Sequence, residues 1–282
     1  MQHVEACPDL GPICATQPQQ PYQHDQTLYS NDLVLDAELG ISRHFGAELV
    51  FGLRQTTDRI HYLDLSGAPY TPPVPDYHHR NETLVGPTDP WLLAHLAGDF
   101  NRLSIAGRAG LTIPLGSTVP NPFELGRLGL PHEHIQFGTG TVDPVLGASI
   151  DRRFDDFTLS IWTLDRFGLM TNGHGYQPNH KLLAGVTASS TLTLPGWRFS
   201  LGLDVYRETA ERWSGVIEDE GNLGRTDVIV ELDASWMFTM GWSAKLGLKI
   251  PVYSAVVGEQ AVYPAIVTLG VSTDFKLGSA SR

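Results

Sequence analysis

The sequence predicts an all-β protein, a single antiparallel, up-and-down transmembrane β-barrel of about twelve strands. Apolar and polar residues alternate with a period of two over many segments, which is typical of strands with one apolar face. Tight turns and long polar connections also alternate along the chain, as they do between the two ends of a membrane barrel. The 29 glycines and 19 prolines accompany few helix-like stretches. No run approaches the roughly 18 apolar residues of a membrane helix.

The first hairpin shows the alternation most clearly. Within 33–43 one parity carries the apolar residues Leu33, Leu35, Ala37, Leu39 and Ile41. The other parity carries Asp36 and Glu38. After a short break at His44-Phe45-Gly46 the pattern resumes over 47–54, so the two runs predict a β-hairpin.

The same unit recurs to the end of the chain. Further alternating runs cover 92–100, 103–113, 142–151, 157–161, 182–194, 197–206, 227–238, 242–250 and 263–274. Short turns follow residues 43, 101, 152, 194 and 238, and long polar segments lie near 65–88, 115–140, 170–180, 207–225 and 253–262. A soluble β-sandwich would also alternate, but it has no reason to sort its loops by length. About eleven strands are visible, and the even number usual in bacterial barrels places a twelfth either before Tyr29 or within 115–140.

Three segments follow from this pattern: a polar N-terminal tail at 1–28, the barrel at 29–277 and a C-terminal extension at 278–282. The tail holds the only cysteines, Cys7 and Cys14. Such a pair favours a disulfide-closed loop in an oxidising compartment such as the periplasm, with two free thiols as the alternative. The tail either forms this loop or plugs the lumen. The barrel prediction requires that the numbering begin at or near the mature terminus.

The charge balance excludes one class of partner. The formal net charge is −12, and no basic patch with interleaved aromatics occurs, so no nucleic-acid partner is expected. The expected partners are outer-membrane lipid and a small-molecule solute, and a periplasmic or membrane protein partner stays open.

If the apolar parity faces lipid, the other parity lines the lumen. The candidate lumen-lining residues are Asp36, Glu38, His95, Asp99, Arg108, Asp204, Glu231, Asp233, Lys245 and Lys249. Carboxylates outnumber cations on this parity, which favours cations and neutral solutes over anions. The alternative is that these charges pair with one another and stabilise a filled barrel.

Histidines provide two further hypotheses. His132 and His134 lie on one face of an extended segment, where a third ligand would allow a zinc or copper site. His78, His79 and His174 are the sources considered for that ligand, and simple solvation is the alternative. His95 and Asp99 share the lumen face, where they form either a pH-dependent gate or a plain hydrogen-bonded pair.

The sequence contains no arrangement that indicates an enzyme. No serine stands beside a histidine with polar support, and no glycine-rich phosphate loop or zinc-protease helix occurs. We therefore expect no catalytic residue and no cofactor.

Two stretches resemble known families. The last strand, with Thr268, Gly270, Thr273 and Phe275, resembles the C-terminal assembly signal of outer-membrane barrels, although Thr273 replaces an aromatic residue and the chain continues past Phe275. Gly138-Thr-Gly-Thr-Val-Asp-Pro-Val-Leu-Gly147, together with Leu111-Thr-Ile-Pro-Leu-Gly116, resembles outer-membrane transporters associated with phenol meta-pathway degradation. That family is distantly related to long-chain fatty-acid and aromatic-hydrocarbon channels, and the resemblance covers about 40 residues of the chain.

These resemblances imply a channel or transporter in the bacterial outer membrane for passive passage of small, apolar or aromatic solutes. The alternative is a structural or partner-binding outer-membrane barrel with a plugged lumen.

Overall fold

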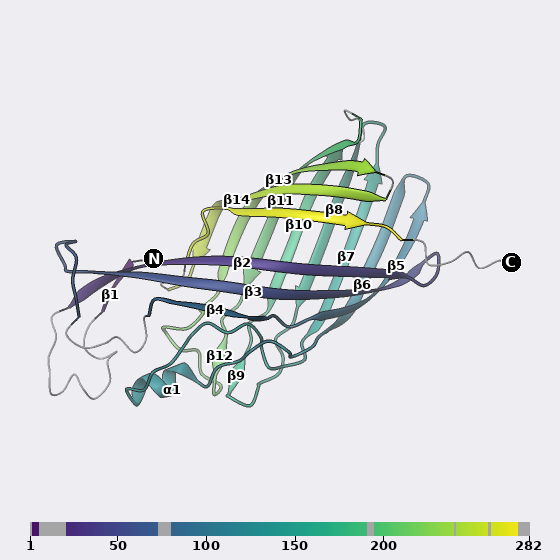
Figure 1. Ribbon diagram of the computed structural model, residues 1–282. Helices are drawn as coiled ribbons and strands as arrows, with labels where there is room; N and C mark the ends of the chain where they lie inside the picture. Colours follow the sequence, from purple (N-terminus) through teal and green to yellow (C-terminus); the bar gives the residue numbers. More distant parts are fainter. Residues whose placement is uncertain are drawn as a thin grey trace.

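The computed structural model describes residues 2–5, 21–72, 80–190, 195–239, 241–258 and 261–275. Over these residues it confirms the predicted all-β fold, with one short helix (Figure 1). No helix in these ranges is long and apolar enough to cross a membrane. The predicted Cys7–Cys14 disulfide and the extension at 278–282 lie outside the described residues and stay predictions.

One antiparallel sheet forms the wall of the molecule. Its eleven long strands, in spatial order, are β2 (Tyr22–Gly40), β3 (Phe45–Leu63), β5 (Trp91–Phe100), β6 (Leu103–Thr112), β7 (Pro144–Arg153), β8 (Phe157–Arg166), β10 (Lys181–Ser190), β11 (Trp197–Glu208), β13 (Arg225–Thr239), β14 (Trp242–Val256) and β15 (Ile266–Thr273). Two short strands, β1 (Gln2–Glu5) and β4 (Glu82–Pro87), pair with β2 and β3. Counting β1, the continuous path holds twelve strands, as predicted.

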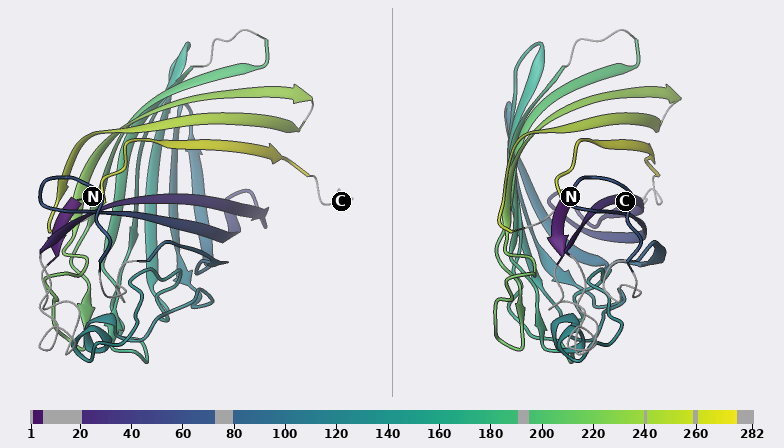
Figure 2. Two further views of the ribbon diagram at one scale, coloured as in Figure 1. Left: turned by 60° about the vertical axis from the view of Figure 1, so that its left-hand side comes forward. Right: turned by 90° about the vertical axis from the view of Figure 1, so that its left-hand side faces the viewer.

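The connections are sorted by length between the two ends of the sheet. Short turns join β2 to β3, β5 to β6, β7 to β8, β10 to β11 and β13 to β14, all at one end (Figures 1 and 2). The other end, called the long-loop end below, carries β4, α1 (Pro122–Arg127), β9 (Tyr176–Gln177) and β12 (Arg212–Trp213). The predicted alternation is confirmed. The 115–140 segment contains α1 and no strand, so it does not supply the twelfth strand.

The first wall strand begins earlier than predicted. β2 starts at Tyr22, so the expected boundary at residue 29 falls inside this strand. Tyr22 is buried against Tyr62 and Tyr70, with ring centroids 5.7 and 5.4 Å away. This aromatic cluster holds the part of the β2–β3 hairpin that extends beyond the neighbouring strands at the long-loop end (Figure 1).

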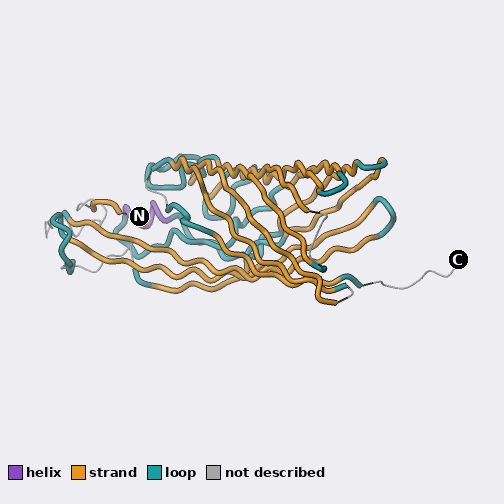
Figure 3. Tube along the Cα trace, turned by 90° about the horizontal axis from the view of Figure 1, so that it is seen from above, coloured by secondary structure: helices purple, strands orange, loops and turns teal. Residues whose placement is uncertain are grey.

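The sheet curls round so that its two outermost long strands flank one opening (Figures 1 and 3). Each of the eleven long strands is antiparallel to the next, so β2 and β15 run in the same direction. No hydrogen-bonded pair joins these two strands in the described part of the chain. Closing this seam with antiparallel pairs requires a strand between β2 and β15, and β1 pairs with this edge of β2 over four residues only.

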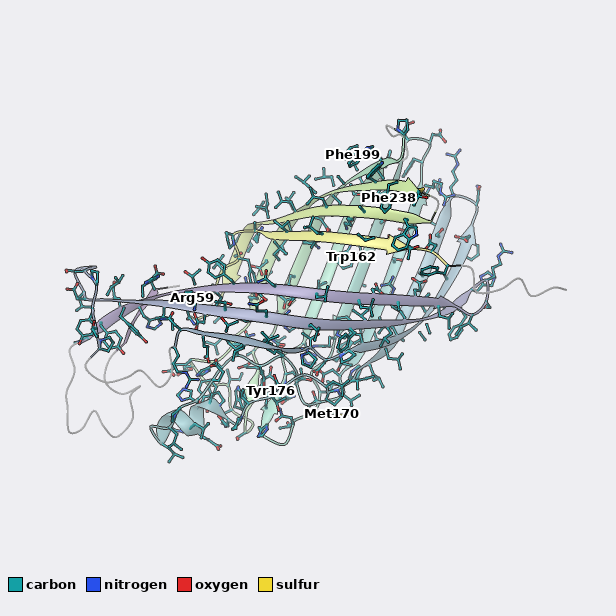
Figure 4. All side chains as sticks on the ribbon, viewed as in Figure 1. Arg59, Trp162, Met170, Tyr176, Phe199 and Phe238 are labelled. Atoms are coloured by element: carbon teal, nitrogen blue, oxygen red, sulfur yellow. The ribbon has the colours of Figure 1, made fainter. Side chains whose placement is uncertain are left out.

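The outward face of the wall is apolar. Leu201, Leu232, Leu248 and Val267 stand in register across β11, β13, β14 and β15. Leu201 is 56% exposed and Val267 is 65% exposed, which is the surface that lipid rather than water would cover. At the short-turn end, aromatic side chains gather as they do at a membrane interface. They include Trp197, Phe199, Trp236 and Phe238, and Figure 4 labels the two phenylalanines.

Candidate functional site

The inward face of β11, β13 and β14 brings five of the predicted lumen residues together. The Lys249 Nζ atom lies 3.5 Å from Asp204 Oδ2 and 3.2 Å from Glu231 Oε1. The Lys245 Nζ atom lies 3.1 Å from Asp233 Oδ1 and 4.0 Å from Glu231 Oε1. We call these five residues the charge ladder. Three carboxylates and two ammonium groups leave the ladder with one negative charge in excess.

Each carboxylate of the charge ladder lies across a glycine of the neighbouring strand. Gly185 pairs with Asp204, Gly202 with Glu231 and Gly247 with Asp233. A Cβ atom on Gly247 would lie 2.5 Å from Asp233 Oδ1, and one on Gly202 would lie 3.3 Å from Glu231 Cβ.

The three carboxylates therefore lie flat against the wall and are largely covered, whereas the lysines project. The side chain of Lys245 is 51% exposed and that of Asp233 only 10%. A solute on this side of the lumen meets ammonium groups first. The excess of carboxylates in the sequence thus overstates the acidity of this surface.

Filling one of these glycine positions is expected to destabilise the wall. A Cβ atom at Gly185 would collide with the Asp204 carboxylate and with the Trp162 ring, which Figure 4 labels. We expect Gly185→Val to cost about 1–3 kcal/mol of stability, the usual range for overpacking. The measurement is the temperature at which the folded, heat-modifiable band is lost on a gel.

Gly107→Val is the matched control, because Gly107 faces outward and a Cβ atom there would meet a single carbonyl oxygen, at 4.0 Å. Equal loss of thermal stability in the two variants would show that the glycine–carboxylate contacts are unimportant.

The other predicted lumen residues form separate contacts. His95 Nε2 lies 3.2 Å from Glu38 Oε1, and Arg108 Nε lies 3.6 Å from Glu48 Oε2. The expected His95–Asp99 pair is wrong, because Asp99 accepts a hydrogen bond from Ser104 instead. Residues four apart on a strand are about 13 Å apart, which is too far for a hydrogen bond. Asp36 lies exposed on β2.

A cavity of about 990 Å³ lies at the long-loop end. All the Arg and Lys side chains that line it belong to wall strands, and each has a carboxylate partner within 3.5 Å. These pairs are Arg54–Asp32, Arg166–Asp143, Lys181–Glu208 and Arg225–Asp227. The loops instead contribute acidic residues to the lining, among them Glu133, Glu211 and Asp219. Sequence reasoning did not identify this cavity, because its lining comes from strand ends and loops far apart along the chain.

The 113–143 connection covers part of this cavity. Its helix α1 begins after Asn121, whose Oδ1 atom accepts hydrogen bonds from the backbone N–H groups of Phe123 and Glu124, a regular N-cap. Phe123 packs against Trp213, and Trp213 against Tyr176, in the cluster of buried apolar residues at the long-loop end. The segment from Glu133 to Thr139 then lines the cavity.

Both ends of this connection are held together by one buried carboxylate. Asp89 Oδ1 accepts a hydrogen bond from Gly116 N at 2.8 Å. Asp89 Oδ2 accepts from Thr139 N at 2.7 Å and from Thr139 Oγ1 at 2.9 Å. Gly116 and Gly138 touch, since a Cβ atom on Gly116 would lie 2.5 Å from Gly138 Cα. The two stretches that resemble the transporter family thus meet each other at this point.

The next residues of the same motif continue the buried network. Thr141 Oγ1 donates to Asp143 Oδ1 at 2.7 Å, and Asp143 N donates to Thr112 Oγ1 at 2.9 Å. Asp143 is fully buried, and this burial raises the pKa of its carboxyl group, which lies 3.5 Å from Arg166.

The segment 133–135 contacts the chain just before β4 through charged groups. Arg80 Nη2 lies 3.3 Å from Glu133 Oε2 and 3.7 Å from Glu82 Oε1. Burial and a hydrogen bond with the Glu82 carboxyl group raise the pKa of Glu133 to about 7. Burial also raises the pKa of Glu211, another acidic residue of the cavity lining, which accepts a hydrogen bond from Trp213 Nε1 at 3.0 Å.

The predicted metal ligands His132 and His134 lie side by side, with ring centroids 5.2 Å apart. His132 Nδ1 lies 2.9 Å from the carbonyl oxygen of Leu130, and the His134 ring packs on Phe123. Among the described residues no group of three His, Cys, Asp or Glu side chains could hold a metal ion. The structure therefore gives the predicted metal site no support within that part of the chain. His78 and His79 lie outside it.

The fold has a counterpart among solved structures. An outer-membrane channel from Pseudomonas putida F1 matches it with a TM-score of 0.56 and 12% sequence identity, over 89% of this chain and 81% of the other. At this identity the match shows the fold alone. No protein-family model and no curated protein matches the sequence. The class that the fold defines is therefore the single antiparallel, up-and-down β-barrel, as the sequence predicts.

Proposed function

We propose that the protein is an outer-membrane channel that lets small solutes cross passively. One observation carries this proposal: a wall with an apolar outer face encloses a polar inner face that leads to a cavity at the long-loop end. Long loops of such barrels face the cell exterior, so the cavity would be the entry vestibule. The named channel of similar fold supports the proposal. No chemical step is involved.

The lining of the cavity supports small solutes that carry an aromatic ring. Trp91, Phe137 and Tyr263 line it together with hydrogen-bonding groups such as Gln136 and Asn179. Pockets of this mixed kind bind a ring on their apolar part and fix its orientation with a few polar groups. The resemblance to transporters associated with phenol meta-pathway degradation points to the same class of solute.

The second candidate is a structural barrel with a plugged lumen. Two observations favour it: the 113–143 connection covers part of the cavity, and many lumen charges are paired within the wall. The two candidates differ in a measurable property, because a plugged barrel passes no solute.

Planar-bilayer recording of refolded protein tests the proposal. We expect stable current steps, and swelling of liposomes that carry the protein when an uncharged aromatic solute that lipid bilayers exclude, such as phenyl glucoside, is added outside. Asp36→Asn is expected to reduce cation selectivity, because Asp36 is exposed on the inner face of β2. The charge-matched control is Asp155→Asn, in the short turn between β7 and β8, where Asp155 pairs with Arg102.

Protein that migrates as a folded barrel on a heat-modifiability gel but gives neither current nor swelling would contradict the channel. That result would favour the plugged structural barrel.

A further inference from the structure

We infer that residues 117–137 form a lid over the cavity at the long-loop end, with a permanent base at Asp89 and a releasable contact at Arg80, Glu82 and Glu133. We call the latter three residues the latch. This inference rests on the proposed function, because it assigns to the lid the control of entry into the same cavity. The difference in strength between the two attachments carries the argument.

The base is buried and densely hydrogen-bonded. Asp89 and Thr139 are 9% and 6% exposed, and three of the bonds that Asp89 accepts are 2.7–2.9 Å long. Bonds to a charged acceptor are about twice as strong as neutral ones, and burial leaves the donors little water to replace them. Gly116 and Gly138 are in direct backbone contact, with no space for a side chain between them. The two chain segments that form the base are therefore closely packed, and separating them costs this contact as well as the hydrogen bonds.

The latch is more exposed than the base, and its contacts are longer. The Arg80 side chain is 38% exposed, and its contacts to Glu133 and Glu82 are 3.3 and 3.7 Å long. One guanidinium group faces two carboxyl groups that are in contact with each other. An ion pair whose cation is open to water contributes little net stability, because water competes for the guanidinium group. The latch is therefore the attachment that releases first.

The contacts on the far side of α1 allow a tilting movement. Asn121 Nδ2 and Glu124 Oε1 reach Ser214 Oγ at 3.4 and 3.3 Å, and Arg127 reaches Glu218 at 3.4 Å. These polar contacts are long and single, and the buried packing on this side is that of Phe123 on Trp213, with Val119 against the same cluster, about which the lid can tilt.

Release of the latch would uncover the cavity from the side of β4. The aromatic ring of Phe137 lies against Gly86 of β4, where a Cβ atom would meet it at 2.7 Å. Once the latch opens, this small contact and the base are what hold that side of the lid. Gly86 has no side chain that could pack around the ring. A tilt of the lid about the base therefore separates Phe137 from β4 and widens the vestibule.

The test compares latch variants with a control on the other side of the lid. At pH 8 we expect Arg80→Gln to raise the single-channel open probability about tenfold, since two carboxylates then face each other without a cation. Glu133→Gln should have the opposite effect, because its amide can donate to Glu82 and keep the latch closed. Arg127→Gln removes the same charge from the lid itself, at its contact with Glu218, and should change the open probability less than twofold.

A second readout needs no current. Spin labels at Val85 on β4 and Leu128 after α1, both exposed, report the separation of the lid from β4. The labelled protein would have Cys7 and Cys14 replaced by serine. We expect a longer distance component in Arg80→Gln and none in Glu133→Gln.

The outcomes separate the two proposals. A conducting protein in which latch and control variants behave alike, with unchanged label distances, would overturn the lid and leave the channel standing. A folded protein that never conducts but shows the label distances shifting as expected would overturn the channel and retain the lid as a moving element.

Discussion

Asp89→Asn is expected to loosen the base of the lid and give the largest effect of any single substitution considered. Asparagine offers one carbonyl oxygen where the aspartate accepts from the backbone N–H groups of Gly116 and Thr139 through two oxygens. At least one buried N–H group loses its acceptor, and the other loses a charged one. We expect a loss of about 2–4 kcal/mol in the free energy of local opening. The measurement is hydrogen exchange at the amides of Gly116 and Thr139, which should become roughly 30- to 1,000-fold faster.

Asp99→Asn is the matched control, because Asp99 is exposed and accepts a hydrogen bond from Ser104 in the β5–β6 hairpin. It should leave exchange at the base unchanged. If Asp89→Asn keeps the exchange rates of the wild-type protein, the base is not held by Asp89 and the account of the family-like motif fails.

The second large effect is a dependence of the open probability on pH. The pKa of Glu133 is raised from its ordinary value of 4.5 to about 7 in the closed latch, chiefly by burial and by contact with Glu82. The protonated form is therefore favoured when the lid is closed. This contribution to closure is complete below pH 4.5 and is lost as the pH rises through about 7. The charged or titratable neighbours of Glu133 in these contacts are Arg80 and Glu82, together with His132 and His134 beside it in the lid.

We expect the open probability to rise about tenfold between pH 5 and pH 8. Each pH unit between the ordinary and the raised pKa of Glu133 changes the open probability by at most a factor of ten, so the upper limit over the whole titration is roughly 300-fold. Recording at several pH values separates the open probability from the unitary conductance, which ionisation of the lumen carboxylates also changes.

Glu133→Gln should keep the lid closed and remove the pH dependence of the open probability. Glu218→Gln, which changes a carboxylate on the opposite side of the lid, should retain it. A wild-type channel whose open probability is constant from pH 5 to pH 8 would show that the latch does not respond to protonation.

Much of the wall could be predicted from the sequence, because the features that define a strand are local. The alternation from Leu33 to Ile41 reports one apolar face, since successive side chains of a strand point to opposite sides. The same parity places Asp36, Glu38 and the charge ladder on the inner face. The lengths of the connections sort the two ends of the sheet, and this too requires no knowledge of which strands pair.

The partners of the inner residues depended on the register between strands. Glu38, 57 positions before His95, is its partner because β2, β3 and β5 lie side by side, whereas Asp99 on the same strand lies too far along it. In the same way, no local pattern shows that Asp204, Glu231 and Asp233 each lie across a glycine. Their exposure, and hence the charge that a solute meets, follows from that register.

The site at the long-loop end was likewise decided by the tertiary structure. The motif from Gly138 to Asp143 is visible in the sequence, but its function as a base appears only when Asp89 and Gly116 are brought against it. The sequence by itself determined a barrel with a polar inner face, because the two-residue period of a strand can be recognised from neighbouring residues. Which charges pair, which are covered and which loop covers the cavity were decided by contacts between residues far apart in the chain, and such contacts leave no periodic trace in a single sequence.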